Sequence, residues 1–312
     1  MFVVKYRKIF FALSTLLTAG AIVIMLVYGF NFGIDFKGGA LLEVSYPAGA
    51  RPTLEMVQGK IDTLGLGGYS VRPSGDNLFV VRTRELNPTE KTTLLSALSY
   101  DSVDGKTQVA NLPREERSNS IGPVVGNELK NKAFVAIAVV ILAIVLFVTF
   151  AFRKVSKPVS SWKYGLVTVL ALVHDVIVPT GVFILFTHFY SGEIDLLFVT
   201  AILAILGYSV HDTIVVFDRV RENLRINSDT RANEDFEITV GKSVSQTFGR
   251  SINTSLTIFL VLVVLYFIGG ETTRNFAFVL LVGVIVGTYS SIFLASPLLV
   301  TLGKMKGKGT EK

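Results

Sequence analysis

The sequence predicts an α-helical polytopic membrane protein with six transmembrane helices and one α+β domain between the first two. Three observations support this fold class. Half of the residues are hydrophobic and only 17% are charged, whereas soluble domains carry about 25% charged residues. Six apolar segments are long enough to cross a bilayer core of about 30 Å. One polar segment with the length of a small domain separates the first two.

Each predicted span is an apolar run of about twenty residues. The six are Ile9 to Phe30, Ala133 to Phe152, Tyr164 to about Phe189, about Leu196 to Phe217, Ser251 to Gly269, and about Phe276 to Leu302. The first follows basic residues, as in a signal peptide. Its apolar run exceeds the roughly 7–15 residues of a signal peptide, and no Ala-x-Ala cleavage site follows it. We therefore expect it to be retained as a span.

Basic residues gather at alternate ends of the predicted spans. They precede the first span, fill the connections after the second and fourth spans, and follow the last span. The positive-inside rule then places both termini in the cytoplasm. We expect the first transmembrane helix at 1–30, an extracytoplasmic domain at 31–131, a five-helix region at 132–303 and a basic cytoplasmic tail at 304–312. Because the positive charge follows topology, nucleic-acid binding is not expected.

The polar segment shows a β-α-β-β-α-β pattern. The expected elements are a strand at Ala40–Pro47, a helix at Thr53–Gly65, a hairpin around Gly75-Asp76-Asn77, a helix at Asn87–Leu98 and an irregular strand within Lys106–Pro123. Asn87 and Glu90 form a helix-start signal. The order predicts a ferredoxin-like domain. It contains no nucleophile, metal cluster or phosphate loop, so binding or a mechanical role is expected.

Two glycine-rich segments flank this domain. Their glycines are Gly33, Gly38, Gly39, Gly122 and Gly126. Glycine adopts backbone conformations that other residues resist. The segments are therefore either loop turns at the membrane exit or hinges that let the outer domain move.

Asp175 lies deep in the third predicted span. It is 12 residues past Lys163, about 18 Å along a helix. An ionisable residue within a span costs about 2.5–3.5 kcal/mol on translocon scales. Asp175 is therefore either a structural residue bonded to a neighbouring helix or part of a proton pathway.

Asp212 is the strongest candidate for a proton site in the fourth span. Tyr208 and Ser209 lie four and three residues before it, on the same helix face, and His211 precedes it directly. A polar stripe favours a bundle-facing site over a helix that ends early in water.

Arg250 opens the fifth span, and Asn253, Thr254 and Thr257 continue its helix face. If the fourth and fifth spans touch, Arg250 can pair with Asp212. Burial and a nearby opposite charge act in opposite directions on a carboxylate, which can then load and release a proton. The alternative for Arg250 is an ordinary residue of the basic boundary.

The sequence gives no sign of a metal site, a cofactor or a catalytic residue. The pairs His174-Asp175 and His211-Asp212 are poor chelates because adjacent side chains diverge by about 100° on a helix. No nucleophile lies in a strained strand-to-helix turn. Between the fourth and fifth spans, Phe236, Val240, Val244 and Phe248 share a face, which predicts an amphipathic helix near 230–248 on the inner membrane surface or against a partner.

Five motifs together resemble the SecD/SecF family of protein-export membrane proteins, on its SecF side. They are FGIDFKGG (Phe32–Gly39), GPVVGNEL (Gly122–Leu129), HDV (His174–Val176), GYSVHDTIVVFDRVREN (Gly207–Asn223) and RSINTSLT (Arg250–Thr257). The resemblance implies half of a transmembrane bundle of the resistance-nodulation-division (RND) superfamily. It also implies a location in the bacterial cytoplasmic membrane.

The resemblance further implies an accessory, non-enzymatic subunit of the Sec translocase. The implied partners are SecD, the SecYEG channel, the SecA motor, translocating preproteins and membrane lipids. The proton-motive force would promote late-stage export, with Asp212 and Arg250 as pathway residues. Two alternatives remain open: a proton-coupled exporter of small molecules or lipids, and a passive scaffold.

Overall fold

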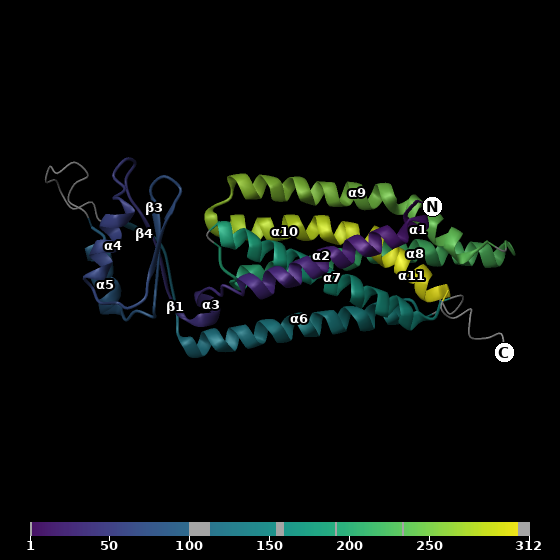
Figure 1. Ribbon diagram of the computed structural model, residues 1–312, viewed down its shortest axis with the longest axis horizontal. Helices are drawn as coiled ribbons and strands as arrows, with labels where there is room; N and C mark the ends of the chain where they lie inside the picture. Colours follow the sequence, from purple (N-terminus) through teal and green to yellow (C-terminus); the bar gives the residue numbers. More distant parts are fainter. Residues whose placement is uncertain (1, 100–112, 154–158, 191, 233, 305–312) are drawn as a thin grey trace. The chain divides into compact units, whose positions relative to one another are not determined.

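The computed structural model describes residues 2–99, 113–153, 159–190, 192–232 and 234–304, and they form two compact units (Figure 1). The helical unit comprises residues 1–31 and 135–312, and the α+β unit comprises Phe32–Phe134. The last residues of the expected basic tail, 305–312, lie outside the described part.

The helical unit contains six helices that are long and apolar enough to cross a membrane. Its elements are α1 (Phe2–Lys5), α2 (Arg7–Tyr28), α6 (Pro123–Ala151, which begins in the α+β unit), α7 (Ser161–Phe189), α8 (Leu196–Asp229), α9 (Phe236–Ile268), and a sixth span made of α10 (Glu271–Tyr289), the π-helical segment η1 (Ser290–Ala295) and α11 (Ser296–Lys304). The predicted six-span fold class is confirmed.

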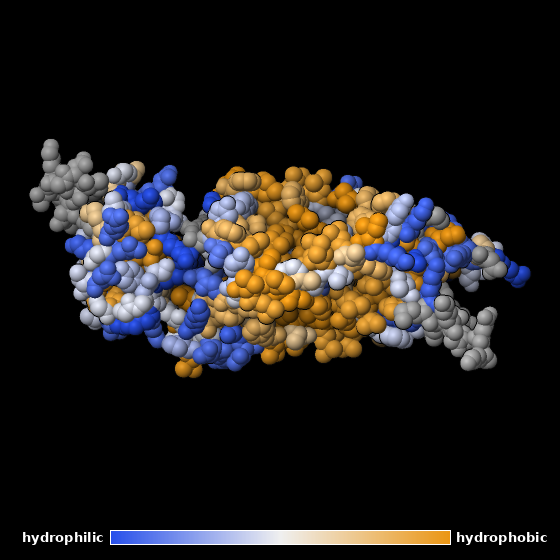
Figure 2. Space-filling model, in the orientation of Figure 1, coloured by the Kyte–Doolittle hydropathy of each residue, from blue (hydrophilic) through white to orange (hydrophobic). Residues whose placement is uncertain are grey.

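Most of the buried residues of the bundle belong to α7, α8 and the sixth span, whereas α2, α6 and α9 are exposed along most of their length. The exposed surface is mainly hydrophobic, as the orange area in Figure 2 shows. Small residues permit close packing in the interior: Gly181 of α7 lies directly against Ala21 of α2, and Gly283 of α10 against Ile205 of α8. Such contacts are typical of helices that associate in membranes.

At the end of the bundle that includes α1, aromatic rings fill the core. Phe152 stacks on Tyr164 with ring centroids 5.1 Å apart, and Phe217 packs edge-on against both rings. All three side chains are almost completely buried. This cluster joins the chain around the end of α6 to α7 and α8.

The helices α8 and α9 are longer than the sequence predicts. The separate amphipathic helix expected near 230–248 is not formed, because α9 begins at Phe236 and continues without a break through the fifth span. Its apolar face, including Val240 and Val244, packs into the core of the helical unit rather than lying on a membrane surface. Likewise, α8 continues past Phe217 to Asp229. Where hydropathy ends, packing between the two helices keeps both helical.

The α+β unit has the predicted ferredoxin-like topology. Its elements are α3 (Ile34–Lys37), β1 (Gly39–Ser45), α4 (Leu54–Asp62), β2 (Ser70–Ser74), β3 (Leu78–Thr83), α5 (Pro88–Ala97) and β4 (Arg114–Ile121). The antiparallel sheet has the order β2-β3-β1-β4. The predicted capping box is confirmed: Asn87 Oδ1 accepts from the Glu90 amide at 2.8 Å, and the Glu90 carboxylate accepts from the Asn87 amide at 3.0 Å.

Three glycines of the flanking segments are explained by close backbone contacts within the α+β unit. A Cβ on Gly38 would lie 2.7 Å from the Pro123 backbone, and one on Gly126 would lie 2.8 Å from the Gly38 nitrogen. Gly39 has a φ of 135°, and its Cβ would meet the Thr83 carbonyl. By contrast, Gly33 and Gly122 have ordinary backbone angles. Gly126 also lies inside α6, not in a loop. The hinge role remains a prediction.

Candidate functional site

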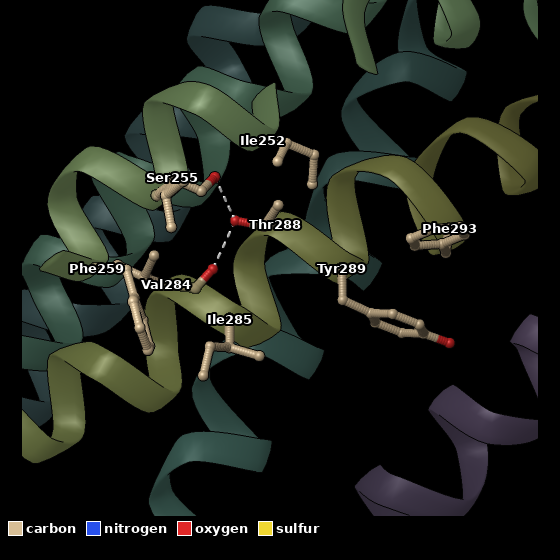
Figure 3. A pocket seen from close by; sticks show the side chains of 9 residues that line it. Ile252, Ser255, Phe259, Val284, Ile285, Thr288, Tyr289 and Phe293 are labelled. Atoms are coloured by element: carbon tan, nitrogen blue, oxygen red, sulfur yellow. Dashed lines mark hydrogen bonds between the residues drawn. The ribbon is translucent and has the colours of Figure 1, made fainter. Parts of the chain in front are cut away.

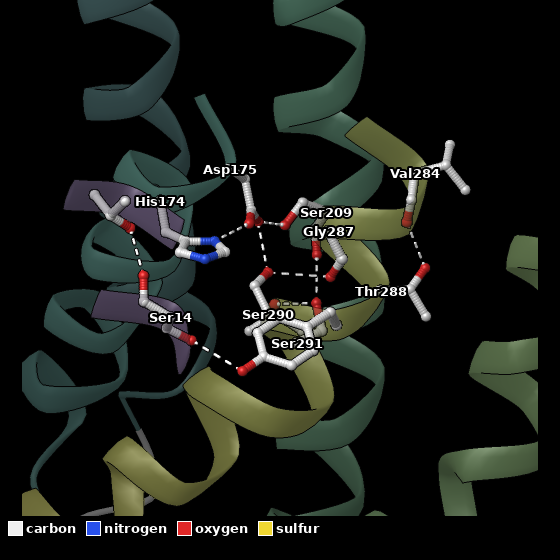
Figure 4. A network of polar contacts seen from close by, with 12 residues as sticks. Ser14, His174, Asp175, Ser209, Val284, Gly287, Thr288, Ser290 and Ser291 are labelled. Carbon is white, nitrogen blue, oxygen red and sulfur yellow. Dashed lines mark hydrogen bonds and ion pairs between the residues drawn. The ribbon is translucent and has the colours of Figure 1, made fainter. Parts of the chain in front are cut away.

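Asp175 lies at the centre of a buried hydrogen-bond network in the helical unit (Figure 4). Its Oδ2 accepts hydrogen bonds from Ser209 Oγ of α8 and from Ser290 Oγ of η1, the latter at 2.7 Å. Its Oδ1 lies 2.9 Å from Nδ1 of His174. The Asp175 side chain is 0% exposed. This carboxylate is therefore satisfied as an anion by three groups from three elements.

The segment η1 brings serines from the sixth span into this network. The Gly287 carbonyl, 3.1 Å from Ser290 Oγ, is a second acceptor for the same hydroxyl hydrogen. Ser291 donates to the Ser209 carbonyl at 3.2 Å and shares a 2.8 Å hydrogen bond with Thr213 of α8. Wide π-helical turns are rare and frequently occur at functional sites. Here the wide turn lets consecutive serines contact both α7 and α8.

Asp212 is also buried, with 2% of its surface exposed. The hydroxyl group of Ser251 on α9 neighbours its carboxylate. Neither Asp212 Oδ2 nor Ser251 Oγ completes a hydrogen bond in the described part of the chain. Since buried polar groups are almost always paired, this position requires a water molecule, a proton or a partner group.

The Asp212–Ser251 position belongs to a ladder of polar pairs between the antiparallel helices α8 and α9. The other pairs are Tyr208 with Ser255 (2.5 Å), Arg219 with Gln246 (2.7 Å), Asn223 with Ser243 (2.8 Å) and Asn227 with Thr239 (2.9 Å). Each of these four pairs is hydrogen-bonded. Among these five positions, the Asp212–Ser251 pair is thus the one without a completed hydrogen bond.

The structure brings Ser251, not the predicted Arg250, to the Asp212 carboxylate. Arg250 is exposed, and the ion pairs of the described residues do not include one between Arg250 and Asp212. Asn253 and Thr257 are exposed as well, and Thr254 is half-buried. The predicted polar face of α9 therefore points away from its own bundle, while Ser251 and Ser255 point inward.

The predicted polar face of α8 is divided between the two sites. Ser209 bonds to Asp175 rather than to Asp212, and Tyr208 bonds to Ser255. His211 is exposed on the other side of α8. Ser251, Ser255, Ser290 and Ser291 were not among the residues predicted from the sequence. The run Tyr289-Ser290-Ser291 within an apolar span was the signal that could have identified the last two.

A groove of about 400 Å³ opens on the surface between α9, α10 and η1 (Figure 3). Apolar side chains such as Ile252, Phe259 and Phe293 line it, and a hydroxyl pair, Ser255 with Thr288 at 2.6 Å, lies on its wall. The lining contains no charged residue. Neither Asp175 nor Asp212 lines the groove.

The chemistry that this arrangement supports is proton binding. The described residues contain no group of three His, Asp or Glu side chains that could hold a metal ion. What the bundle contains instead is two buried carboxylates, with hydroxyl groups from three neighbouring helices around them.

Comparisons with known proteins agree with this architecture. The model of the SecD/SecF C-terminal family of protein-export membrane proteins matches residues 104–305, and the SecD/SecF GG motif matches residues 23–46. The protein translocase subunit SecF of Thermobaculum terrenum is 38% identical over 96% of this chain and 93% of its own length. That of Anaerolinea thermophila is 35% identical over 94% and 91%.

Two solved structures share the fold. The translocon-associated membrane protein SecDF from Thermus thermophilus is 30% identical, with a TM-score of 0.77 over 96% of this chain. A second SecDF structure, in a super-membrane-facing form, is 28% identical with a TM-score of 0.64. The chain spans only 38% and 39% of the length of these two SecDF chains.

Proposed function

The chain belongs to the SecD/SecF family of protein-export membrane proteins, and we propose that it couples proton movement to late-stage protein export across the bacterial cytoplasmic membrane. It is a multi-pass membrane protein, and its relatives are translocase subunits. The observation that carries the proposal is the buried Asp212 carboxylate with an unpartnered oxygen in the described chain. A buried charge without a partner costs several kcal/mol, so binding a proton from one side of the membrane stabilises this site strongly.

An energy comparison favours more than one proton for each cycle. Inverting a two-state equilibrium from 1:99 to 99:1 requires about 5.5 kcal/mol. One charge crossing a potential of 100 mV releases about 2.3 kcal/mol. The energy released by two protons therefore comes close to this requirement, whereas that released by one proton does not. The proposed pathway accordingly includes Asp175 as well as Asp212. We expect protonation to drive movement of the α+β unit, with the flanking glycine segments as hinges.

Exposed small and polar residues of α8 and α9 support a partner within the membrane. On α8 they include Ala204, Gly207 and His211, and on α9 they include Arg250 and Asn253. Polar side chains facing lipid are costly, whereas small residues allow close helix contact. We propose that SecD covers this surface, so that Arg250 acts at the interface between the two subunits. SecYEG, SecA and preproteins are the further proposed partners, on the basis of family membership.

The distribution of basic residues supports the proposed orientation. Both termini would be cytoplasmic and the α+β unit extracytoplasmic, because the connections after the second and fourth spans are basic. Labelling of single cysteines by a membrane-impermeant thiol reagent checks this directly, since the chain has no native cysteine.

Proton flux is the decisive test. The complex with SecD is reconstituted into proteoliposomes with an imposed pH gradient, and flux is read with an internal pH dye. Asp212→Asn is expected to reduce the flux about 10²-fold, the lower range for a positioned proton-transfer group. The matched control is Asp218→Asn, an exposed carboxylate on the same helix.

Export of a preprotein into inverted membrane vesicles is measured with the same two variants. Equal flux and equal export for Asp212→Asn and the wild type would reject the proposal and leave a passive scaffold. Flux that responds to small apolar compounds, with export unchanged, would instead support the small-molecule exporter.

A further inference from the structure

His174 has a ring nitrogen that the described structure leaves without a partner. The side chain is 4% exposed, and its Nε2 makes no hydrogen bond in the described part of the chain. Its Nδ1 lies 2.9 Å from Asp175 Oδ1. Because a carboxylate only accepts hydrogen bonds, Nδ1 carries the hydrogen, and the neutral ring then keeps its free lone pair on Nε2.

We propose that His174 Nε2 is a second proton-binding site of the helical unit, distinct from Asp212. This inference rests on the proposed function, since it adds a proton site to the same transport cycle. A proton delivered by hydronium adds to the Nε2 lone pair, and water is released. The product is an imidazolium beside the Asp175 carboxylate, so the pair becomes neutral overall. Asp175 is the positioning residue: it fixes the ring and balances its charge, as a carboxylate does for histidine in hydrolase triads.

In the described part of the chain, the only ion pair of Asp175 is the one with His174. The elements that pack against α7 are α2, α8, α10, η1 and α11. The titratable or charged residues of these elements are Arg7, Lys8 and Tyr28 at the ends of α2, Tyr208, His211, Asp212 and the charged end of α8 from Asp218, Glu271, Arg274 and Tyr289 of α10, and Lys304 at the end of α11. On α7 itself they are Lys163, Tyr164 and His188, each at least ten residues from His174. The ring of Tyr289 lies 6.2 Å from that of His174. The Tyr289 hydroxyl is already occupied, because it donates to the Phe10 carbonyl and accepts from Ser14.

The hydrogen bond from Ser209 brings this site close to the Asp212 position along α8. Ser209 donates to Asp175 and lies three residues before Asp212, so less than one turn of α8 separates the two sites. When His174 binds a proton, it neutralises the charge that Ser209 and Ser290 solvate. Ser290 has a second acceptor in the Gly287 carbonyl. Protonation thus changes the groups that hold α8 and η1 against α7 (Figure 4).

The chain contains only three histidines, so the protonation of each can be measured separately. The chain is labelled with ¹⁵N-histidine, assembled with its unlabelled SecD partner in lipid bilayers, and studied by nitrogen NMR. His188→Gln and His211→Gln assign the signals. Spectra are recorded from about pH 8 to about pH 5, the range in which histidine side chains generally change charge, and the Nε2 signal of His174 is expected to report proton binding. In Asp175→Asn the signal of the protonated ring is expected to weaken, because the carboxylate that balances its charge is gone.

A His174 signal that stays neutral over this range would overturn the proposal, and so would a titration that is unchanged in Asp175→Asn. The proposed function is tested independently by proton flux. Flux in the wild type with a permanently neutral His174 would reject this site alone. Titration of His174 without flux would reject the proposed function alone.

A functional variant separates proton binding from packing. His174→Asn can still donate a hydrogen bond to Asp175 but cannot bind a proton, and it is expected to reduce flux about 10²-fold. His188→Asn is the control, because His188 is exposed. Wild-type flux in His174→Asn would contradict a proton-carrying role, whether or not the bond to Asp175 is kept.

Discussion

Asp175 and Asp212 are both buried in the helical unit, but their surroundings differ. Asp175 has three hydrogen-bonding neighbours on α7, α8 and η1. Asp212 has one neighbouring hydroxyl, on Ser251, and an oxygen without a partner in the described part of the chain. The Asp175 carboxylate has its hydrogen-bond partners within this chain, whereas Asp212 Oδ2 has none in the described part.

The difference separates a carboxylate that also holds helices together from one that does not. A carboxylate with three donors holds helices together as an anion, and its removal strands those donors. An open carboxylate contributes little to packing but is free to exchange a proton or to meet a group from a partner. Asp212 lies on α8, whose exposed small and polar residues also await a partner, so this carboxylate and the proposed SecD surface lie on one helix.

The largest expected effect tests this contrast through stability. Asp175→Ala leaves Ser209, Ser290 and His174 without their acceptor, at about 1–3 kcal/mol for each stranded group. Asp212→Ala breaks no hydrogen bond in the described structure and is expected to cause no comparable loss of stability, because it removes an unpartnered buried carboxylate rather than an acceptor shared by three donors. Unfolding of the purified chain in detergent, followed by circular dichroism, measures both variants.

Similar losses for the two variants would show that Asp212 is also a structural residue. Asp218→Ala is the control for removing a carboxylate from α8, because Asp218 is exposed. It is expected to behave like Asp212→Ala.

Sequence reasoning found both carboxylates but not their partners. An ionisable residue in a span is visible in any apolar sequence, and the repeated His-Asp pair marked both positions. Helical periodicity told us that Arg250, Asn253 and Thr257 share a face, but not which face of α9 points inward. That direction depends on packing against α8, and the inward face proved to be that of Ser251 and Ser255.

The elements of the α+β unit were predictable because their signals are local. The capping box at Asn87 and Glu90, and the alternation in β1, depend on residues a few positions apart. The end of α8 and the start of α9 were not predictable from hydropathy. Both helices continue past the apolar residues because Asn223 and Asn227 pair with Ser243 and Thr239 across the hairpin.

A smaller effect is expected from two glycines close to the carboxylate sites. A Cβ on Gly287 would lie 3.1 Å from Cβ of Ser209, the residue that bonds Asp175. A Cβ on Gly207 would meet nothing within 4 Å. Gly287→Ala is expected to destabilise the purified chain by about 1 kcal/mol through overpacking. Gly207→Ala is expected to stabilise it by about 0.5–1 kcal/mol, the usual gain in a helix.

The same detergent unfolding experiment compares the two variants. If both variants stabilised the chain, the Asp175 site would tolerate displacement of Ser209, which would weaken the contrast between the two carboxylate sites. The measurement is then repeated with SecD bound. If SecD packs closely on this face of α8, Gly207→Ala should no longer be more stable than the wild type.

The smallest expected effect concerns a carboxylate in water, which serves as the reference for the two buried ones. Two hydrogen bonds from Arg84, at 2.5 and 3.0 Å, together with that from the Asn87 amide, lower the pKa of Glu90 from its ordinary value of 4.5 to about 2. The folded state therefore binds this proton less readily than the unfolded state does. The stabilisation is complete above about pH 4.5 and is lost as the pH falls towards about 2.

Glu90→Gln should flatten this part of the pH profile of hydrogen exchange in α5. Because the site is exposed, the effect should be small and should weaken with added salt. A profile that is identical in Glu90→Gln, or insensitive to salt, would show that the Arg84 pair contributes nothing to the stability of α5.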